Sequence, residues 1–523
     1  MFIANRGSLS RRLRLTALLP CFAAVPALAQ RPLRAADSAL VGRILLAEDR
    51  RDSASAAFDE GKRHADPRIQ YIARRAEARV SDAKFARRDS IPGAPKLPAP
   101  PAYVDPAWRL RFRALSARSD CAALRTALAD SAWAVRLRAL DLVGRDCAAD
   151  TALMRIVRGW AGAPSATSQR RRGGVSWQPA AHAIVALARA APAEARAVLP
   201  LALSTSVPWM RTYAARAAGI LRDTTALRHL AGDSNANVME AAVDALSSTA
   251  GHAGDDEFLA ALGAHGYQAV RAAARALKGS PRSGDVVMSA LVAARRLRAD
   301  SSETSRDARM ALMELLMEFA TSAQVPDIIP LAADFDCEVA SIAAAIARKL
   351  RTTAQPRCTP LPIALPADAV SLALGRDVRI RVTLADSSGG GSFVVRLRGD
   401  VAPLMGARIL ALAQSGYYDG LVWHRVEPDF VVQGGGLGAN EYAGNPRFLR
   451  DELGTVPHVR GTVGMSTRGH DTGDAQWFFN LRDNRRLDRD YTLFAEVVEG
   501  IDVVDGILEG DVISHMEVLP PSK

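Results

Sequence analysis

A recurring alanine-rich segment between residues 34 and 350 constrains the fold of this chain more than any other sequence feature. Each copy begins with a few polar residues and continues for about 15 residues with small apolar side chains at helical spacing. Several copies lie about 30 residues apart, enough for a helix pair with its turns. Such a pair buries its apolar face only against neighbouring pairs, so the pattern predicts stacked helices. The copies begin at Asp66, Ser131, Val207, Asn235, Tyr267 and Asp336.

These segments resemble the second helix of HEAT repeats, which commonly has a polar start, then Val-Arg and a run of alanines. Val270-Arg271 followed by three alanines has this order. The resemblance implies an elongated α-solenoid over residues 30–355, with a concave surface that would bind another protein or an unfolded client. The alternative that the residues leave open is an irregular helical bundle in an alanine-rich chain.

Two proline-rich segments interrupt the helical pattern, at residues 91–101 and 356–366. Proline lacks the backbone N–H donor and restricts the residue before it, so neither segment can be a helix. The second predicts a linker over residues 356–376. Beyond it, alternation at 378–384 and the glycine-rich turn at 387–391 predict a β-hairpin, so the C-terminal part is rich in strands.

Residues 423–435 are the most informative part of this C-terminal region. Side chains alternate between the two faces of a strand, so Arg425 and Gln433, eight positions apart, can share one face. Phe430 comes from the segment between them. That face would carry a cation, an amide and an aromatic wall, without an acid, a nucleophile or a metal ligand. Such a set suits a reaction in which no covalent bond breaks.

The segment resembles the signature of the cyclophilins, the family of proline cis/trans isomerases. Further segments resemble that family in the family's own order: a strand, helix and Tyr-Asp-Gly at 391–420, a pocket strand at 460–466, Gln-Trp-Phe-Phe-Asn at 476–480 and a closing segment at 487–500. The resemblance covers residues 377–519. It implies a closed β-barrel with flanking helices and peptidyl-prolyl cis-trans isomerase activity, without a cofactor or a metal.

The resemblance also assigns roles to single residues. Arg425 would hydrogen-bond the proline nitrogen once amide resonance is lost, and Gln433 would bind the substrate backbone and orient Arg425. His424 is expected to face the other side of the strand as a structural residue. The pocket for the proline ring would be formed by Phe430, Met465, Phe478, Leu487 and Tyr491.

Three positions depart from the family pattern. Tyr491 stands where many members have a histidine, and it can still donate a hydrogen bond. Arg486 stands where many have a tryptophan, which is expected to weaken binding of cyclosporin-like macrocycles more than proline turnover. Trp477 replaces a phenylalanine and is expected to point into the barrel or beneath it.

The first 29 residues have the pattern of a signal peptide: four arginines, a short apolar run and Ala27-Leu28-Ala29. We expect cleavage after Ala29 and a periplasmic or secreted protein, with an uncleaved amphipathic N-terminus as the alternative. The apolar run is shorter than the ~20 residues that span a bilayer, and no later segment qualifies. We therefore expect no membrane insertion.

Removal of this segment lowers the net charge from +11 to +7, spread over the remaining chain. The compact basic run at residues 170–172 is expected to be a solvated loop rather than a nucleic-acid site. No Cys/His spacing indicates zinc.

Four cysteines remain after the expected cleavage. Disulfides form in the oxidising compartments that exported proteins enter. We favour the pairs Cys121–Cys147 and Cys337–Cys358, and buried free thiols remain the alternative.

The function predicted from the sequence is a peptidyl-prolyl cis-trans isomerase that acts on exported proteins, with a helical-repeat part that binds protein. The competing hypothesis is a non-catalytic scaffold that grips proline-containing segments. The sequence does not identify the client, the oligomeric state, the export route or any regulation of one part by the other.

Overall fold

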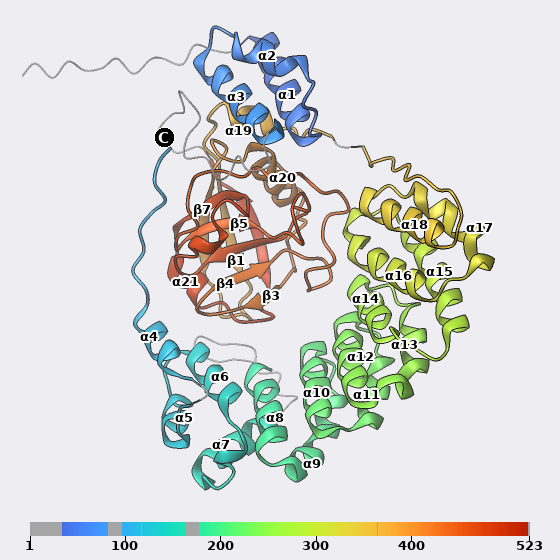
Figure 1. The fold of residues 1–523 in the computed structure, drawn as a ribbon. Coiled ribbons are helices and arrows are strands. Elements are labelled where there is room, and N and C mark those ends of the chain that lie inside the picture. Colours follow the sequence, from blue (N-terminus) through green and yellow to red (C-terminus); the bar gives the residue numbers. More distant parts are fainter. Residues whose placement is uncertain (1–33, 82–96, 117, 164–176, 363, 521–523) are drawn as a thin grey trace, which may run out of the picture.

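The computed structural model describes residues 34–81, 97–116, 118–163, 177–362 and 364–520. It shows helices arranged in an arc around a C-terminal sheet (Figure 1). The expected signal peptide and the basic run at 170–172 lie outside the described residues. Among those residues, the longest and most apolar helices still fall short of what crossing a bilayer requires.

The arc is built from two layers of helices, which we call the helical array. Most helices adjacent in sequence pack against each other, and each even-numbered helix from α4 to α16 also packs on the next even-numbered one, such as α8 on α10 and α10 on α12. The even-numbered helices form the inner layer: α4 Ala107–Ala114, α6 Trp133–Leu142, α8 Gln178–Ala190, α10 Pro208–Leu221, α12 Ala236–Ala250, α14 Tyr267–Ala276, α16 Arg306–Phe319 and α18 Cys337–Lys349. The outer layer holds α5 Cys121–Ala127, α7 Thr151–Ala161, α9 Pro192–Leu203, α11 Thr224–Ala231, α13 Asp255–Ala261, α15 Ser283–Ala299 and α17 Val325–Ile328.

Alanines account for the close approach of these helices. Four alanines of α10 are fully buried: Ala214, Ala215, Ala217 and Ala218. In α14, Ala272 to Ala274 expose at most 2% of their surface. Two inner helices begin at a side-chain cap: Asn235 and Asp336 accept hydrogen bonds from the first backbone N–H groups of α12 and α18. The helical periodicity read from the sequence is therefore confirmed element by element.

The C-terminal part is a curled antiparallel sheet of eight strands in the order β3-β4-β6-β5-β7-β2-β1-β8. An isolated bridge between Val422 and Val512 links the two ends of this order. The strands are β1 Arg379–Leu384, β2 Ser392–Leu397, β3 Trp423–Val426, β4 Val431–Gly434, β5 Thr462–Met465, β6 Trp477–Asn480, β7 Leu493–Glu499 and β8 Ile513–Val518. Three helices accompany them: α19 Ala369–Ala373, α20 Pro403–Gln414 and α21 Ile501–Asp505.

The first three helices share their core with this sheet, and not with the array. They are α1 Ala35–Asp49, α2 Ala56–Lys62 and α3 Pro67–Ser81. Ile44 and Ile72 belong to the same buried cluster as Ile380 and Leu404. The structure thus differs from the boundary drawn on sequence, which placed residues 34–81 in the repeat domain. Their helical periodicity resembles that of the array, and only the tertiary packing separates them.

A buried ion cluster joins these helices to the sheet. The Arg79 guanidinium donates to Glu48 Oε1 at 2.7 Å and to the carbonyls of Val401 and Leu453. The Glu452 carboxylate, within 3.9 Å of the same guanidinium, accepts from two backbone N–H groups at the start of α20. Burial raises the pKa of Glu452 to about 7, and the neighbouring Glu48 carboxylate adds to the shift.

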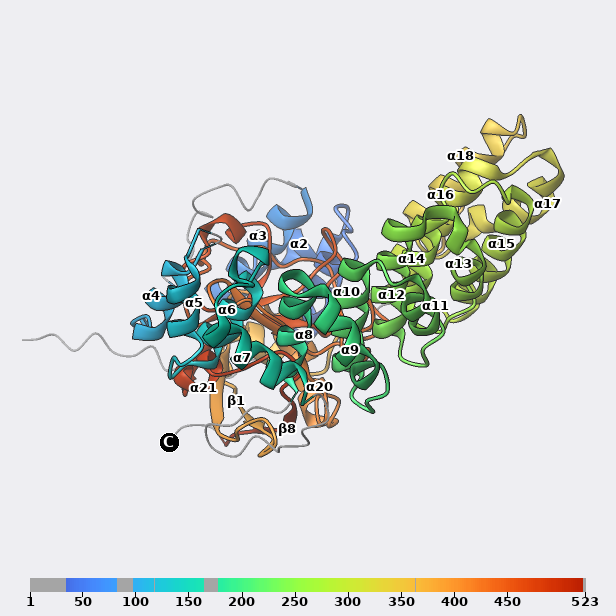
Figure 2. The same cartoon turned by 90° about the horizontal axis from the view of Figure 1, so that it is seen from below.

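Loops of the C-terminal part lie on the inner side of the array (Figures 1 and 2). Asn237 of α12 donates to the Gly438 carbonyl at 2.8 Å, and Glu303 N donates to the Pro446 carbonyl. Gly510 lies against the stacked rings of Trp177 and Trp209, where a Cβ would come within 2.8 Å of Trp177. The concave side that the sequence assigned to a partner protein thus contacts the chain's own C-terminal part.

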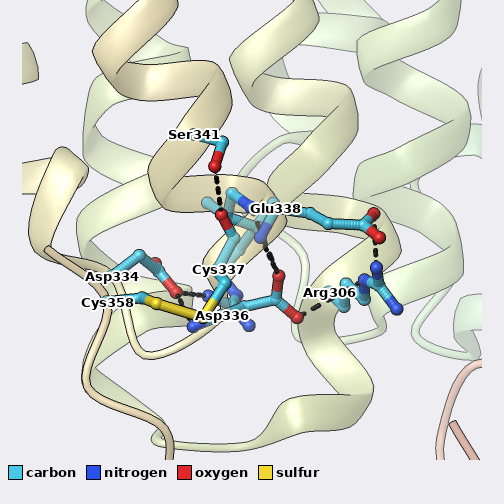
Figure 3. Close-up of a disulfide and its surroundings, with 9 residues drawn as sticks. Arg306, Asp334, Asp336, Cys337, Glu338, Ser341 and Cys358 are labelled. Carbon is cyan, nitrogen blue, oxygen red and sulfur yellow. Dashed lines mark hydrogen bonds and ion pairs between the residues drawn. A yellow bond between two sulfur atoms is a disulfide. The ribbon is translucent and has the colours of Figure 1, made fainter. Parts of the chain in front are cut away.

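The cysteines pair as Cys121–Cys147 and Cys337–Cys358, the pairs favoured on sequence. The first joins the start of α5 to a 3-10 turn before α7. The second joins the start of α18 to the segment that returns towards the sheet (Figure 3). Near it, Arg306 forms ion pairs with Asp336 and Glu338 (Figure 3).

Replacing Arg79 by alanine is expected to lower the free energy of unfolding by about 3–5 kcal/mol, because two buried carboxylates lose their cation. The measurement is urea unfolding of the full chain. Arg63→Ala, at an exposed position after α2, is the control and should change stability by about 0.5 kcal/mol or less. Equal stabilities of the two variants would contradict the assignment of Arg79 to a shared core.

Because its four cysteines are paired, we expect a protein of residues 30–523, purified without reductant, to have no cysteine that reacts with a thiol reagent, even after denaturation. Reduction should release four thiols and lower stability by about 3 kcal/mol for each loop of this size. Thiol titration before and after reduction, with mass spectrometry of the peptides, checks both statements. Thiols that react before reduction would show unpaired cysteines.

Candidate active site

The hairpin of β3 and β4 places the two polar residues of the site side by side. Arg425 and Gln433 face each other as direct partners across the two strands, as alternation predicts. A tight turn closes the hairpin, because Glu427 N donates to the Val431 carbonyl and Phe430 N donates to the Glu427 carbonyl. The turn fixes Phe430 next to the arginine.

The Arg425 side chain points outward, with 45% of its surface exposed. Its Nη1 donates to Gln433 Oε1 at 3.4 Å, and its Nε donates to Glu427 Oε1 at 2.9 Å. The guanidinium carbon lies 5.9 Å from the centre of the Phe430 ring. Within the described part of the chain, Gln433 Nε2 is buried and has no hydrogen-bond partner. One end of this amide therefore orients the arginine, and the other end has no hydrogen-bond partner among the described residues.

Next to this pair lies a small apolar cluster that is separate from the sheet core. Val431, Phe478 and Leu487 form its buried base, and Phe430 and Tyr491 pack against it. The Tyr491 ring meets Phe478 edge to face at a centroid distance of 5.7 Å. The structure thus brings together four of the five pocket residues named on sequence.

Met465 lies apart from this cluster and Val431 takes part in it. Phe478 pairs with Gly464 across β5 and β6, and Met465 pairs with Trp477. Because neighbours on a strand face opposite sides, Met465 and Trp477 point into the sheet core, where both are fully buried. Val431 could have been found from sequence, since it stands two positions before Gln433 and shares its face.

Polar residues that the sequence analysis did not identify hold the cluster in place. The His458 ring stacks on Phe478 at 5.9 Å, and burial lowers the pKa of His458, so that the ring stays neutral. Asn484 donates to the Phe430 carbonyl at 3.0 Å and to Asn480 Oδ1 at 2.7 Å. These contacts join β6 to the β3–β4 turn and to the segments before β5 and after β6, so they do not follow from any single stretch of sequence.

Two charged residues lie near the pocket, and of these the sequence analysis considered Arg486 but not Glu427. Arg486 lies over the Phe430 ring, with its guanidinium carbon 4.3 Å from the ring centre. It replaces an apolar wall with a cation–π contact. Glu427 holds the Arg425 guanidinium from the side opposite Gln433.

This arrangement places a cation and an amide side chain beside an apolar cluster. Among the described residues, no group of three or more His, Cys, Asp and Glu side chains could hold a metal ion. The geometry suits recognition of a proline ring and of the amide next to it.

The model of the family "Cyclophilin type peptidyl-prolyl cis-trans isomerase/CLD" matches residues 380–522. A peptidyl-prolyl cis-trans isomerase of Helicobacter pylori is 35% identical over 130 residues, which cover 24% of this chain and 80% of that protein. This chain belongs to the cyclophilin family. Peptidyl-prolyl cis-trans isomerase A of Dickeya dadantii is 34% identical over 147 residues, which cover 27% of this chain and 76% of that protein.

The match to some longer relatives is partial. Peptidyl-prolyl cis-trans isomerase-like 2 of Cryptococcus neoformans is 38% identical over 124 residues, and the chain spans 22% of its length. The crystal structure of a cyclophilin type isomerase of Cryptosporidium parvum is 19% identical, covers 28% of this chain and 100% of that one, and has a TM-score of 0.26.

The helical array holds the active-site loop of the cyclophilin domain. Arg109 of α4 is fully buried and donates to the Pro428 carbonyl at 2.9 Å, to the Leu481 carbonyl at 2.7 Å and to Asp505 at 2.8 Å. The Leu481 N–H in turn donates to the Phe430 carbonyl. A residue outside the family match therefore fixes the segment that carries Phe430.

Gly464→Ala is expected to impair the pocket, because its Cβ would lie 2.3 Å from Phe478 Cζ, and that ring is held between His458 and Tyr491. Displacement of Phe478 should raise KM for proline peptides and cost about 1–3 kcal/mol of stability. Gly159→Ala, where a Cβ meets nothing within 4 Å, is the matched control. Isomerase kinetics and thermal unfolding check this expectation. An unchanged KM would contradict the assignment of Phe478 to the substrate pocket.

Proposed function

We propose that this chain catalyses cis/trans isomerisation of peptide bonds that precede proline. Rotation about such a bond must overcome a barrier of ~20 kcal/mol, because amide resonance is lost. The twisted transition state has a proline nitrogen with a localised lone pair. A guanidinium that hydrogen-bonds this lone pair stabilises the transition state more than the planar ground state.

The observation that carries the proposal is the position of Arg425 between Gln433 and the cluster of Phe430, Phe478 and Leu487. A proline ring in that cluster would present its nitrogen to the cation, and the free Gln433 N–H would bind a neighbouring carbonyl. Arginine offers several donors in a rigid fork, which a lysine ammonium does not reproduce.

We further propose that the protein acts on exported polypeptides in the periplasm or outside the cell. The signal-like pattern of residues 1–29 supports this location, and so do two disulfides, which persist in oxidising compartments. The clients would be proline-containing segments of proteins that fold after export.

We also propose that the helical array is a HEAT-like solenoid and that the strands form a closed barrel. The two-layer packing of the helices supports the first, and the Val422–Val512 bridge supports the second. Because the inner layer contacts the chain's own loops, a partner protein would bind the outer layer. There Met288 and Val292 of α15 expose 59% and 60% of their surface.

The test uses the full chain, because α1–α3 share the core of the cyclophilin domain. Arg425→Ala and Arg425→Lys should each lower kcat/KM on a short proline peptide by about 10²-fold or more, as expected when a transition-state donor is lost. Arg381→Ala, an exposed arginine on β1 that pairs with Glu517, is the control and should keep full activity. Wild-type rates at the uncatalysed background would favour the non-catalytic scaffold.

A further inference from the structure

Two adjoining cavities separate the active-site strand from the inner layer of the array. The first has a volume of about 940 Å³ and lies between Arg425 and helices α6, α8 and α10. The second, of about 490 Å³, extends along α10 and α12. They share Arg216, His424 and Glu509 in their walls, so they form one groove that begins at the catalytic arginine. Their sizes are those of ligand sites, which commonly have volumes of about 300–1,000 Å³.

Most acidic groups near the arginine already have partners. Asp141 accepts from His182 at 2.7 Å, and the Tyr213 hydroxyl donates to Glu509 at 2.7 Å. Glu427 pairs with Arg425 itself. The Tyr213–Glu509 contact also ties the array to the cyclophilin domain along the near end of the groove.

The far end differs, because it presents two carboxylates that lack such partners. Glu240 and Asp244 stand one turn apart on α12 and both line the second cavity. Within the described residues, neither carboxylate has a hydrogen bond or an ion pair, although arginines of α10 and α14 lie near them. Burial raises the pKa of Glu240 to about 7, and the Asp244 charge adds to the shift. Glu240 is half-buried and Asp244 is exposed, so both carboxylates are open to a cationic side chain that enters the cavity.

His424 adds a polar side chain, with ring nitrogens that the described residues leave unsatisfied, to the wall of the groove. It lines both cavities, and in the described part of the chain its two ring nitrogens are buried without a hydrogen-bond partner. Burial, reinforced by the adjacent Arg425 cation, lowers the pKa of His424 to about 4. The neutral ring has one donor and one acceptor, the pair that an extended polypeptide backbone can satisfy. The structural role expected for His424 from the sequence does not account for its two ring nitrogens, which have no partner among the described residues.

We propose that this groove binds the client chain beside its proline, and that Glu240 and Asp244 select clients with a lysine or arginine in that stretch. The inference rests on the proposed isomerase function and names its substrate class. The client would run from Arg425 past His424 into the second cavity. Its basic side chain would then lie between the two carboxylates of α12.

The test measures kcat/KM of the full chain on a series of proline peptides. Each carries one lysine at successive positions on either side of the proline, with alanine and glutamate peptides for comparison. We expect one lysine position to raise kcat/KM about tenfold over alanine, the effect of a charge-assisted hydrogen bond in a partly buried site. In Glu240→Gln/Asp244→Asn the lysine-to-alanine ratio should fall to about one. The ratio should survive in Asp146→Asn/Asp300→Asn, which removes two exposed charges of the array outside the groove.

A second variant keeps the test decisive if the neutral one folds poorly. Glu240→Lys/Asp244→Lys should shift the preference to glutamate at the same peptide position. A wild type that turns over the alanine peptide but ignores lysine, or a lysine preference that survives the neutral variant, would overturn the inference and leave the isomerase proposal intact. A wild type without activity on any peptide would instead refute the proposed function.

Discussion

The core shared by α1–α3 and the C-terminal sheet is the constraint on which the rest of the structure depends. It brings the two ends of the described chain into one body, so the array between them is a loop anchored at both ends. An array that starts and ends on the same body must curve around it, and its inner layer therefore faces the sheet (Figure 1). The buried Arg79 cluster strengthens this anchor. If α3 separated from the sheet, a buried charge would lose its partner, which costs free energy.

This arrangement changes what the helical array does for the active site. A free solenoid would offer its concave face to other molecules. Here the array supplies Arg109 to the loop that carries Phe430, and it supplies one wall of the space next to Arg425. The array therefore takes part in forming the site, and substrates that reach the arginine meet residues that the cyclophilin domain alone does not have.

Much of the site could be predicted from sequence because its main parts are local. Arg425 and Gln433 belong to one hairpin, and alternation within a hairpin fixes which side chains share a face. Phe478, Leu487 and Tyr491 come from short segments whose order resembles a known family. The assignment of Met465 to the pocket was wrong for a physical reason. Gly464 of β5 lies opposite Phe478 of β6, so Met465, the next residue on β5, points into the sheet core. That register depends on pairing between strands, and no single segment contains it.

By itself, the sequence determined the elements: helices with alanine faces, their caps, the breaks at proline-rich segments and the polar pair on one hairpin. These features depend on residues a few positions apart, where backbone geometry leaves little choice. Three features follow only from the packed fold: α1–α3 join the sheet, Arg109 reaches a carbonyl 319 residues away, and Glu240 and Asp244 line a cavity that adjoins the one beside Arg425. Contacts between residues so far apart in sequence depend on how whole apolar faces pack together. The helical periodicity of a segment does not reveal which part of the molecule the helix packs against.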